Sequence, residues 1–195
     1  MELIIINNND LEQNVYIYFD PTTKEGVVID PGNNPEDIME AINQNNIKVK
    51  AILLTHGHFD HISSAEEIGK LTGGLIHCHE QDKQLLEDPA LNLSVMIRKE
   101  IKFSPDRLLG DSIFCFKVIH TPGHTPGCVC YYDEENGIIF TGDTLFKSAV
   151  GRTDMPLGDY GAMFRSIEEK LFSLPDDTLV YPGHGESTTI GLEKR

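Results

Sequence analysis

The spacing of apolar and polar residues predicts strands and helices in alternation through the first half of the chain. Three short apolar runs are separated by Pro, Gly and Asn residues that favour turns, which predicts a β-meander over Glu2–Asn7, Asn14–Asp20 and Glu25–Gly32. A helix is predicted next at 34–46, with Asn34 as its candidate N-cap and Pro35 at its first position. The other elements predicted in this half are a buried strand at Val49–Thr55, a helix at Ile62–Gly74 that ends at paired glycines, a strand at Leu75–His79 and a helix over "EQDKQLLED" at 80–88.

The second half repeats this order of strands and helices. Residues 89–111 carry no clear pattern, whereas Tyr160–Leu174 predicts an amphipathic helix because Met163, Ile167 and Leu171 recur on one stripe. Two similar halves, each a sheet with helices on one face, predict an α/β fold built as a four-layer αββα sandwich in a single domain, residues 1–195. The strands predicted in the second half are Asp111–Thr121, Gly127–Asp133, Asn136–Asp143 and Thr178–Gly185.

Composition and charge exclude several classes of partner. The chain has 195 residues, 39% of them hydrophobic, and a formal net charge of −15. A negative field repels nucleic acid and anionic membranes, so neither is an expected partner. The N-terminus lacks the basic leader of a signal peptide, and no apolar run approaches the roughly 18 residues of a membrane span, so we expect a cytoplasmic protein. Four cysteines are too few for a disulfide framework at this length.

Four predicted strands end in the same way. Each short apolar run breaks at Gly or Pro and places His or Asp at the break, as in "AILLTHGH", "KVIHTPGH", "GIIFTGD" and "TLVYPGH". Strands of one core deliver their ends to a shared rim, where the loops that follow them converge. We therefore expect these strand ends to gather seven side chains into one site: His56, His58, Asp60, His61, His124, Asp143 and His184.

The residue types in this set indicate a metal centre. Imidazole nitrogen and carboxylate oxygen suit a borderline divalent cation, Zn²⁺ above all, with iron or manganese as alternatives. His56 and His58 lie two apart in an extended segment and can bind one ion together, while Asp60 and His61 face a neighbouring position. Seven ligands exceed one tetrahedral ion but suit two ions bridged by a carboxylate, about 3.5–4 Å apart with a hydroxide between them. The absence of a cysteine among the candidates favours an open, catalytic site.

These residues resemble the metallo-β-lactamase superfamily, whose H-x-H-x-D-H signature is present here as "HGHFDH" at 56–61. The resemblance implies the metallo-β-lactamase fold, with one metal ion held by His56, His58 and His124. It implies a second ion held by Asp60, His61 and His184, a bridging Asp143, and Asp60 as the group that orients the hydroxide. Histidine at position 58, where flavodiiron-type oxygen reductases have glutamate, points away from that branch.

Three further segments resemble the short, single-domain glyoxalase II-like hydrolases: "HTPGHTPGCVCYY", "FTGDTLFKSAVGRTDMPLGDY" and "PGHGEST". This resemblance implies hydrolysis of a thioester of the S-2-hydroxyacylglutathione type, a small anionic thiol ester. Full-length glyoxalase II has an added helical domain at the C-terminus that helps to hold glutathione, and this chain is expected to lack it. Lys147 and Arg152 follow the bridging Asp143 and are candidates to bind the anionic substrate, although both also suit plain loop cations.

Two other functions remain open at this stage. Persulfide dioxygenases, which use a single iron, also resemble the chain at "HTPGC" and "GRTD", and all seven ligand types occur in both branches. A non-catalytic scaffold is the third hypothesis, and the intact ligand set counts against it. His120, four residues before His124, is a candidate to orient that ligand.

Overall fold

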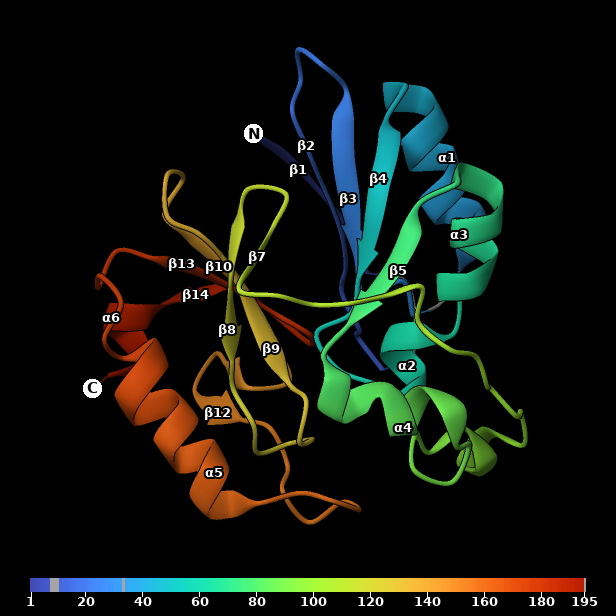
Figure 1. Ribbon diagram of the computed structural model, residues 1–195. Coiled ribbons are helices and arrows are strands. Elements are labelled where there is room, and N and C mark those ends of the chain that lie inside the picture. Colours follow the sequence, from blue (N-terminus) through green and yellow to red (C-terminus); the bar gives the residue numbers. More distant parts are fainter. Residues whose placement is uncertain (8–10, 33, 195) are drawn as a thin grey trace.

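The computed structural model describes residues 1–7, 11–32 and 34–194, and it confirms the four-layer architecture. Two sheets face each other and helices cover their outer faces (Figure 1). The first sheet has the order β1 (Glu2–Ile6), β2 (Val15–Phe19), β3 (Glu25–Ile29), β4 (Lys48–Leu53), β5 (Leu75–Cys78), β6 (Arg107–Leu108). The second has the order β14 (Thr188–Thr189), β13 (Leu179–Pro182), β10 (Ile138–Gly142), β9 (Val129–Asp133), β8 (Phe116–His120), β7 (Ser112–Ile113).

The predicted meander is confirmed, because β1, β2 and β3 pair antiparallel, whereas β4, β5 and β6 continue the first sheet in parallel. The predicted strand at 111–121 is instead a hairpin: β7 and β8 pair antiparallel across a turn at Phe114 and Cys115. Phe114 adopts φ 55°, a backbone conformation that a continuous strand does not allow. A short hairpin of β11 (Leu145–Phe146) and β12 (Ala149–Val150) forms beyond β10.

Alternation along the strands divides the core into three apolar layers. In β2, Val15, Ile17 and Phe19 pack toward the helices of the first half, while Tyr16 and Tyr18 face the second sheet. The second sheet alternates in the same way: Phe116, Tyr131 and Phe140 fill the space between the sheets, whereas residues of the other face, such as Tyr132 and Ile139, pack on a helix. In both sheets, successive side chains therefore alternate between the layer under the helices and the layer between the sheets.

The helices cover the outer faces of the sheets. In Figure 1, α1 and α3 lie on the first sheet and α5 lies on the second. The helices are α1 (Pro35–Asn45), α2 (Phe59–Ile62), α3 (Ala65–Thr72), α4 (Lys83–Glu87), α5 (Tyr160–Arg165) and α6 (Ile190–Glu193), with single turns η1 (Glu80–Asp82) and η2 (Ser94–Ile97) and a π-helical segment η3 (Ser166–Leu171). None of the helices in the described residues has the length and apolarity needed to cross a bilayer.

Three local predictions need correction. Asn34 occupies the N-cap position of α1, but its backbone is left-handed at φ 54° and its side chain makes no capping hydrogen bond. The helix predicted at 62–74 is confirmed only over α3, because Ile62 ends the separate helix α2 and Ser63 and Ser64 lie between the two helices. The stripe of Met163, Ile167 and Leu171 is buried as expected, although the helix changes from α to π geometry at Ser166.

Two tyrosines join the halves next to the candidate site. Tyr131 of β9 donates its hydroxyl to the carbonyl of Leu54, 2.7 Å away, and Tyr16 of β2 donates to the carbonyl of Pro182 at 2.6 Å. Each accepting carbonyl lies two residues before a predicted metal-binding histidine in the opposite half. The packing of one sheet on the other therefore positions the loops that follow β4 and β13.

Candidate metal centre

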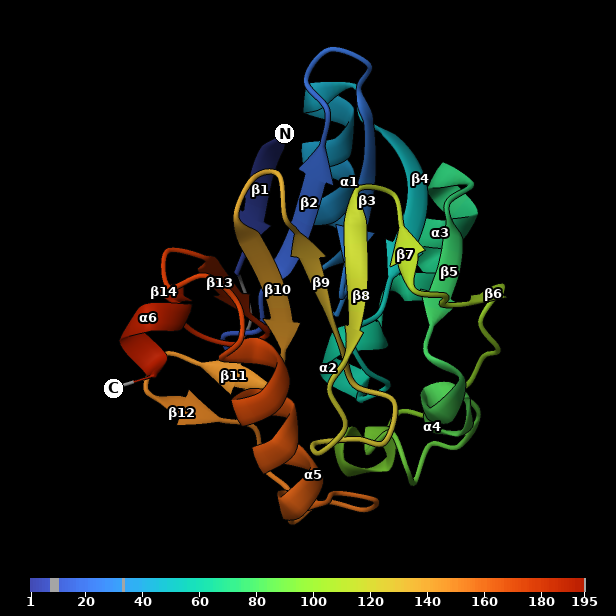
Figure 2. The same cartoon turned by 60° about the vertical axis from the view of Figure 1, so that its left-hand side comes forward.

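All seven predicted side chains meet at one end of the sandwich. In Figure 2 the loops after β4, β8, β10 and β13 converge there, and α2 begins within the first of them. The side chains form three overlapping groups, and within each group the candidate ligand atoms lie within 4.8 Å of one another. The first group is His56, His58 and His124, the second is His56, His61 and Asp143, and the third is Asp60, His61 and His184.

The distances connect the groups into one cluster. His58 Nδ1 lies 2.8 Å from His124 Nε2, which in turn lies 3.5 Å from Asp143 Oδ2. The other oxygen of the same carboxylate, Asp143 Oδ1, lies 3.3 Å from His61 Nε2 and 3.6 Å from His184 Nε2. Asp143 thus lies between the first group and the third, in the position that a bridging ligand requires.

The hydrogen bonds behind the histidines prepare them to bind a cation. His124 Nδ1 donates to the carbonyl of Arg152 at 2.7 Å, and His184 Nδ1 donates to the carbonyl of Leu11 at 2.8 Å. Because a carbonyl can only accept, the proton of each neutral ring is on Nδ1, and Nε2 presents its lone pair to the cluster. The same tautomer follows for His61, whose Nδ1 lies 2.9 Å from a carboxylate of Asp30.

Unsatisfied atoms in the cluster fit a divalent cation. Burying a polar atom without a partner costs free energy, so such atoms indicate a missing ligand when they converge. Five side-chain atoms in the described residues are buried without a hydrogen-bond partner, and three of them belong to this cluster: His56 Nε2, His58 Nε2 and Asp143 Oδ1. The donor set of imidazoles and carboxylates therefore fits the ion that the sequence predicts.

Asp30 is a functional residue that sequence reasoning missed. Its carboxylate is buried at the end of β3, where Oδ1 accepts the amide of Thr55 at 2.7 Å and Oδ2 accepts the hydroxyl of Thr55 at 2.5 Å. Oδ2 also accepts from His61 Nδ1, which forms a carboxylate–histidine pair behind the third group. The motif "VVIDPG" resembles an ordinary strand-to-turn junction, so only the position of Asp30 in space reveals its role.

Charge separates the two ends of the cluster. Burial, with the positive potential of neighbouring histidines, lowers the pKa of His56 and lowers that of His58 to about 3. Burial also acts to lower the pKa of His61, but the carboxylates of Asp143, Asp60 and Asp30 outweigh it and raise that pKa well above its ordinary value. His56 and His58 are therefore neutral and ready to bind a cation near pH 7, whereas His61 must release a proton first.

A close approach of backbone shapes the site beside Asp143. A Cβ at position 183 would lie 2.3 Å from Asp143 Oδ1 and 2.7 Å from His61 Cε1, so only glycine fits immediately before His184. The sequence "PGHG" therefore provides close packing as well as a turn.

The remaining candidates lie outside the cluster. Lys147 forms an ion pair with Glu186, and Arg152 forms a two-point ion pair with Asp154, with Nε–Oδ1 and Nη2–Oδ2 distances of 2.9 Å. Both cations are exposed. His120 stacks on His79 with ring centroids 4.1 Å apart and donates to the carbonyl of Pro126, in the loop that carries His124. These contacts are with His79 and with the loop, and not with the ring of the ligand.

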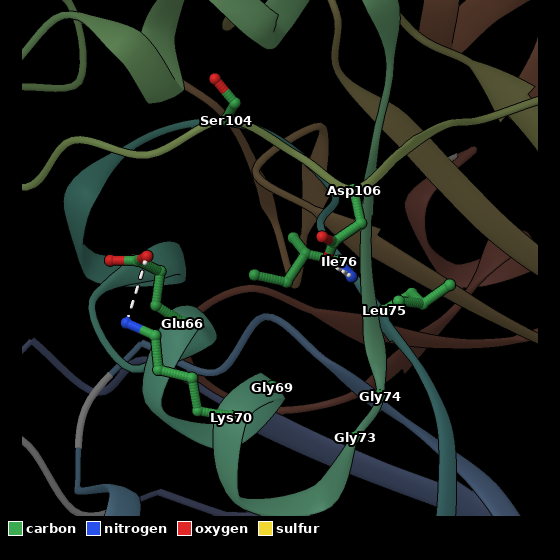
Figure 3. Close-up of a pocket in the computed structure, with 9 residues that line it drawn as sticks. All are labelled: Glu66, Gly69, Lys70, Gly73, Gly74, Leu75, Ile76, Ser104 and Asp106. Atoms are coloured by element: carbon green, nitrogen blue, oxygen red, sulfur yellow. Dashed lines mark hydrogen bonds and ion pairs between the residues drawn. The ribbon is translucent and has the colours of Figure 1, made fainter.

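A separate hollow lies on the first half of the molecule. Figure 3 shows the residues around it, which come from α3, the turn at Gly73 and Gly74, β5 and the segment before β6. Lys70 pairs with Glu66 at its edge, and Asp106 accepts the amide of Ile76 at 2.9 Å. None of the residues that line the hollow belongs to the histidine cluster.

Comparisons with known proteins agree on one family. Residues 8–184 match the model of the metallo-beta-lactamase superfamily. The chain is 38% identical to the hydroxyacylglutathione hydrolase GloC of Haemophilus influenzae, over 100% of this chain and 96% of that protein. The structure of BLEG-1, described as a B3 metallo-beta-lactamase, is 36% identical with a TM-score of 0.93, covering 98% of this chain and 96% of that one. TTHA1623 in a di-iron-bound form is 37% identical with a TM-score of 0.89, covering 98% and 97%.

Proposed function

The chain belongs to the metallo-β-lactamase superfamily, and on that premise we propose that it is a two-metal hydrolase of a thioester of the S-2-hydroxyacylglutathione type. One observation carries the proposal: His124 and His184, anchored through Nδ1, cluster with His56 and His58, whose Nε2 atoms are unsatisfied, around one shared carboxylate, that of Asp143. We infer that Zn²⁺ is the resident metal and that the enzyme acts in the cytoplasm on a small molecule.

The ligand assignment follows the groups of side chains. His56, His58 and His124 would hold one ion, and Asp60, His61 and His184 would hold the other, with Asp143 between them. When bound, divalent ions supply a hydroxide at neutral pH and stabilise the negative charge that develops on an attacked carbonyl. A thiolate leaves readily, so the chain need not provide a strong general acid.

Asp60 has a second role in this proposal. Its Oδ2 lies 3.3 Å from His184 Nε2 and 3.8 Å from His61 Nε2, and part of its side chain is exposed at the site. Although burial opposes it, the positive charges of His61 and His184 lower the pKa of Asp60, so the carboxylate is ionised at neutral pH. An ionised carboxylate there can accept a hydrogen bond from the nucleophile and orient it toward the substrate.

GloC supports the thioester, because that relative is named as a hydroxyacylglutathione hydrolase and spans nearly the same length. Because BLEG-1 is described as a metallo-beta-lactamase, a β-lactam is an alternative substrate to test. The di-iron form of TTHA1623 shows that a similar fold binds iron. Iron is also the metal of the persulfide dioxygenase alternative. Lys147 and Arg152 would bind the carboxylates of glutathione in place of Glu186 and Asp154, since an exposed ion pair contributes little stability and is easily exchanged.

The test is a side-by-side assay on enzyme of measured metal content. S-lactoylglutathione, a β-lactam and glutathione persulfide are supplied separately, with thiol release, lactam absorbance and oxygen uptake as the three readouts. We expect thiol release to dominate and to disappear in Asp60→Ala. Oxygen uptake with glutathione persulfide, in enzyme that holds one iron per chain, would refute the hydrolase proposal and favour a persulfide dioxygenase.

Arg152→Ala separates the substrate-binding proposal from the chemistry. We expect it to raise KM for S-lactoylglutathione with little change in kcat, because the guanidinium would contact only the thiol moiety. Lys102→Ala, which removes an exposed cation outside the loops of the cluster, is the matched control. An unchanged KM in Arg152→Ala would show that Arg152 does not bind the substrate.

A further inference from the structure

Asp82 is a fully buried aspartate that none of the proposed chemistry uses. It lies in η1, directly before α4, and its side chain is 0% exposed. Its Oδ2 accepts the amide of Gly57 at 2.9 Å and the hydroxyl of Thr125 at 2.7 Å, and its Oδ1 accepts the amide of Gly127 at 2.7 Å. These three hydrogen bonds therefore join the carboxylate to donors on two loops.

Those two loops carry the first group of histidines. Gly57 lies between His56 and His58 after β4, and Thr125 follows His124 in the loop between β8 and β9. The loops are far apart in sequence and belong to opposite halves of the sandwich. One buried carboxylate thus connects the backbone beside all three histidines of the first group.

We propose that Asp82 is a positioning residue for the first metal site, where it fixes the separation between the loop of His56 and His58 and the loop of His124. The inference rests on the metal centre proposed above. Asp30 has the corresponding role in the third group through His61, so each half of the centre has its own buried carboxylate. Buried carboxylates that accept several hydrogen bonds hold loops strongly, because a charged acceptor roughly doubles the strength of each bond.

Close packing on Asp82 supports the proposal independently of its hydrogen bonds. A Cβ at position 127 would lie 2.5 Å from the backbone nitrogen of Asp82 and 2.7 Å from its Oδ1. The second loop therefore rests directly on the backbone of η1, at a distance that only glycine allows. Asp82 therefore contacts this loop through its backbone as well as through the hydrogen bonds of its carboxylate.

The chemistry of an amide predicts the effect of Asp82→Asn. The two backbone donors use different oxygens, Gly57 on Oδ2 and Gly127 on Oδ1. An asparagine has one oxygen, so in either orientation its NH₂ group faces a backbone N–H and leaves that donor unsatisfied. We expect one loop to move, and we expect Zn²⁺ affinity at the first site to fall about 10–100-fold.

The experiment measures Zn²⁺ affinity by competition with a chromophoric chelator, together with metal content per chain after gel filtration. Asp82→Asn is made in three backgrounds: the wild type, His184→Ala, which retains the first group, and His124→Ala, which retains the third. The affinity should fall in the His184→Ala background and stay unchanged in the His124→Ala background. This pattern identifies coupling to the first site, which a general loss of stability would not produce.

Asp133→Asn is the matched control. Asp133 is also buried and accepts three hydrogen bonds on two oxygens, from the hydroxyl of Tyr18 and from the backbone and side chain of Asn136. It should lower the melting temperature without changing Zn²⁺ affinity. Equal affinity in Asp82→Asn and wild type, or an equal loss in both single-site backgrounds, overturns the positioning role. If the wild type itself binds no Zn²⁺, the metal centre fails, and this inference fails with it.

Discussion

Replacing Asp30 by asparagine tests how the second metal site is prepared. In the native chain Oδ1 accepts the amide of Thr55, and Oδ2 accepts both the hydroxyl of Thr55 and His61 Nδ1. If the asparagine oxygen keeps the bond to the Thr55 amide, its NH₂ group faces His61 Nδ1 and makes that atom an acceptor. The ring proton then moves to Nε2, which is the atom 3.3 Å from Asp143 Oδ1, and the nitrogen is lost as a ligand.

The opposite amide orientation is also costly. It places NH₂ against the buried amide of Thr55, and an unsatisfied buried donor costs about 1–3 kcal/mol. Loss of a carboxylate behind a metal-binding histidine typically lowers affinity 10–100-fold, which corresponds to about 1.4–2.7 kcal/mol. Both routes give the same magnitude, so we expect Asp30→Asn to weaken Zn²⁺ binding at the second site by one to two orders of magnitude.

The assay is a chelator competition at fixed pH in the two single-site backgrounds. Asp30→Asn should lose affinity in His124→Ala, which retains Asp60, His61 and His184, and should leave His184→Ala unchanged. Asp133→Asn controls for the loss of a buried carboxylate away from the cluster. A variant that binds Zn²⁺ as tightly as its parent in the His124→Ala background would refute the tautomer argument.

Three other predictions concern the same centre. Asp60→Ala and His58→Ala should abolish thioester turnover, and near-normal kcat at full metal content in either variant would contradict the mechanism. Gly183→Ala should displace Asp143 or His61 by inserting a Cβ 2.3 Å from Asp143 Oδ1, which metal analysis would detect as less than two ions per chain, whereas Gly110→Ala, with no atom within 4 Å of its Cβ, should bind metal normally. Acidification from about pH 8 to 6 should weaken Zn²⁺ binding at the second site more than at the first. The pKa of His61 is raised, so below that pKa the metal-free protein holds a proton on His61 that the cation must displace, which lowers the affinity about tenfold per pH unit. His58 in the first site has a pKa of about 3 and stays neutral over this range. Isothermal titration in buffers of different ionisation enthalpy would count the protons released, and equal pH dependence at both sites would contradict that assignment.

Strand ends were predictable because their chemistry is local. The breaks at "THGH", "TPGH" and "YPGH" place histidines directly after apolar runs, and strands that share a core must deliver those ends together. The layer assignment of β2 was not predictable in this way, because all five of its residues are apolar and the period of two does not say which face meets the helices.

Asp30 and Asp82 could not be found in this way. Asp30 precedes Pro-Gly and resembles a turn residue, and Asp82 lies in the polar run "HEQDKQ" that suits an exposed helix. Each is buried only because a loop from a distant part of the chain packs over it. The break between α2 and α3 has a sequence signal that the prediction passed over, because Ser64 takes the N-cap position of α3 and Glu67 follows three residues later. The change to π geometry at Ser166–Leu171 has no such signal in the sequence.

The reciprocal tyrosine bonds have a mechanical consequence. Tyr131 and Tyr16 each reach across the sandwich to the carbonyl that precedes a ligand loop of the other half. Four candidate ligands belong to the first half and three to the second, so an ion bound by ligands of both halves would cross-link them. Separating the two sheets would break metal–ligand bonds, so the metal-bound protein should resist mechanical unfolding and proteolysis as a single unit until the cations dissociate.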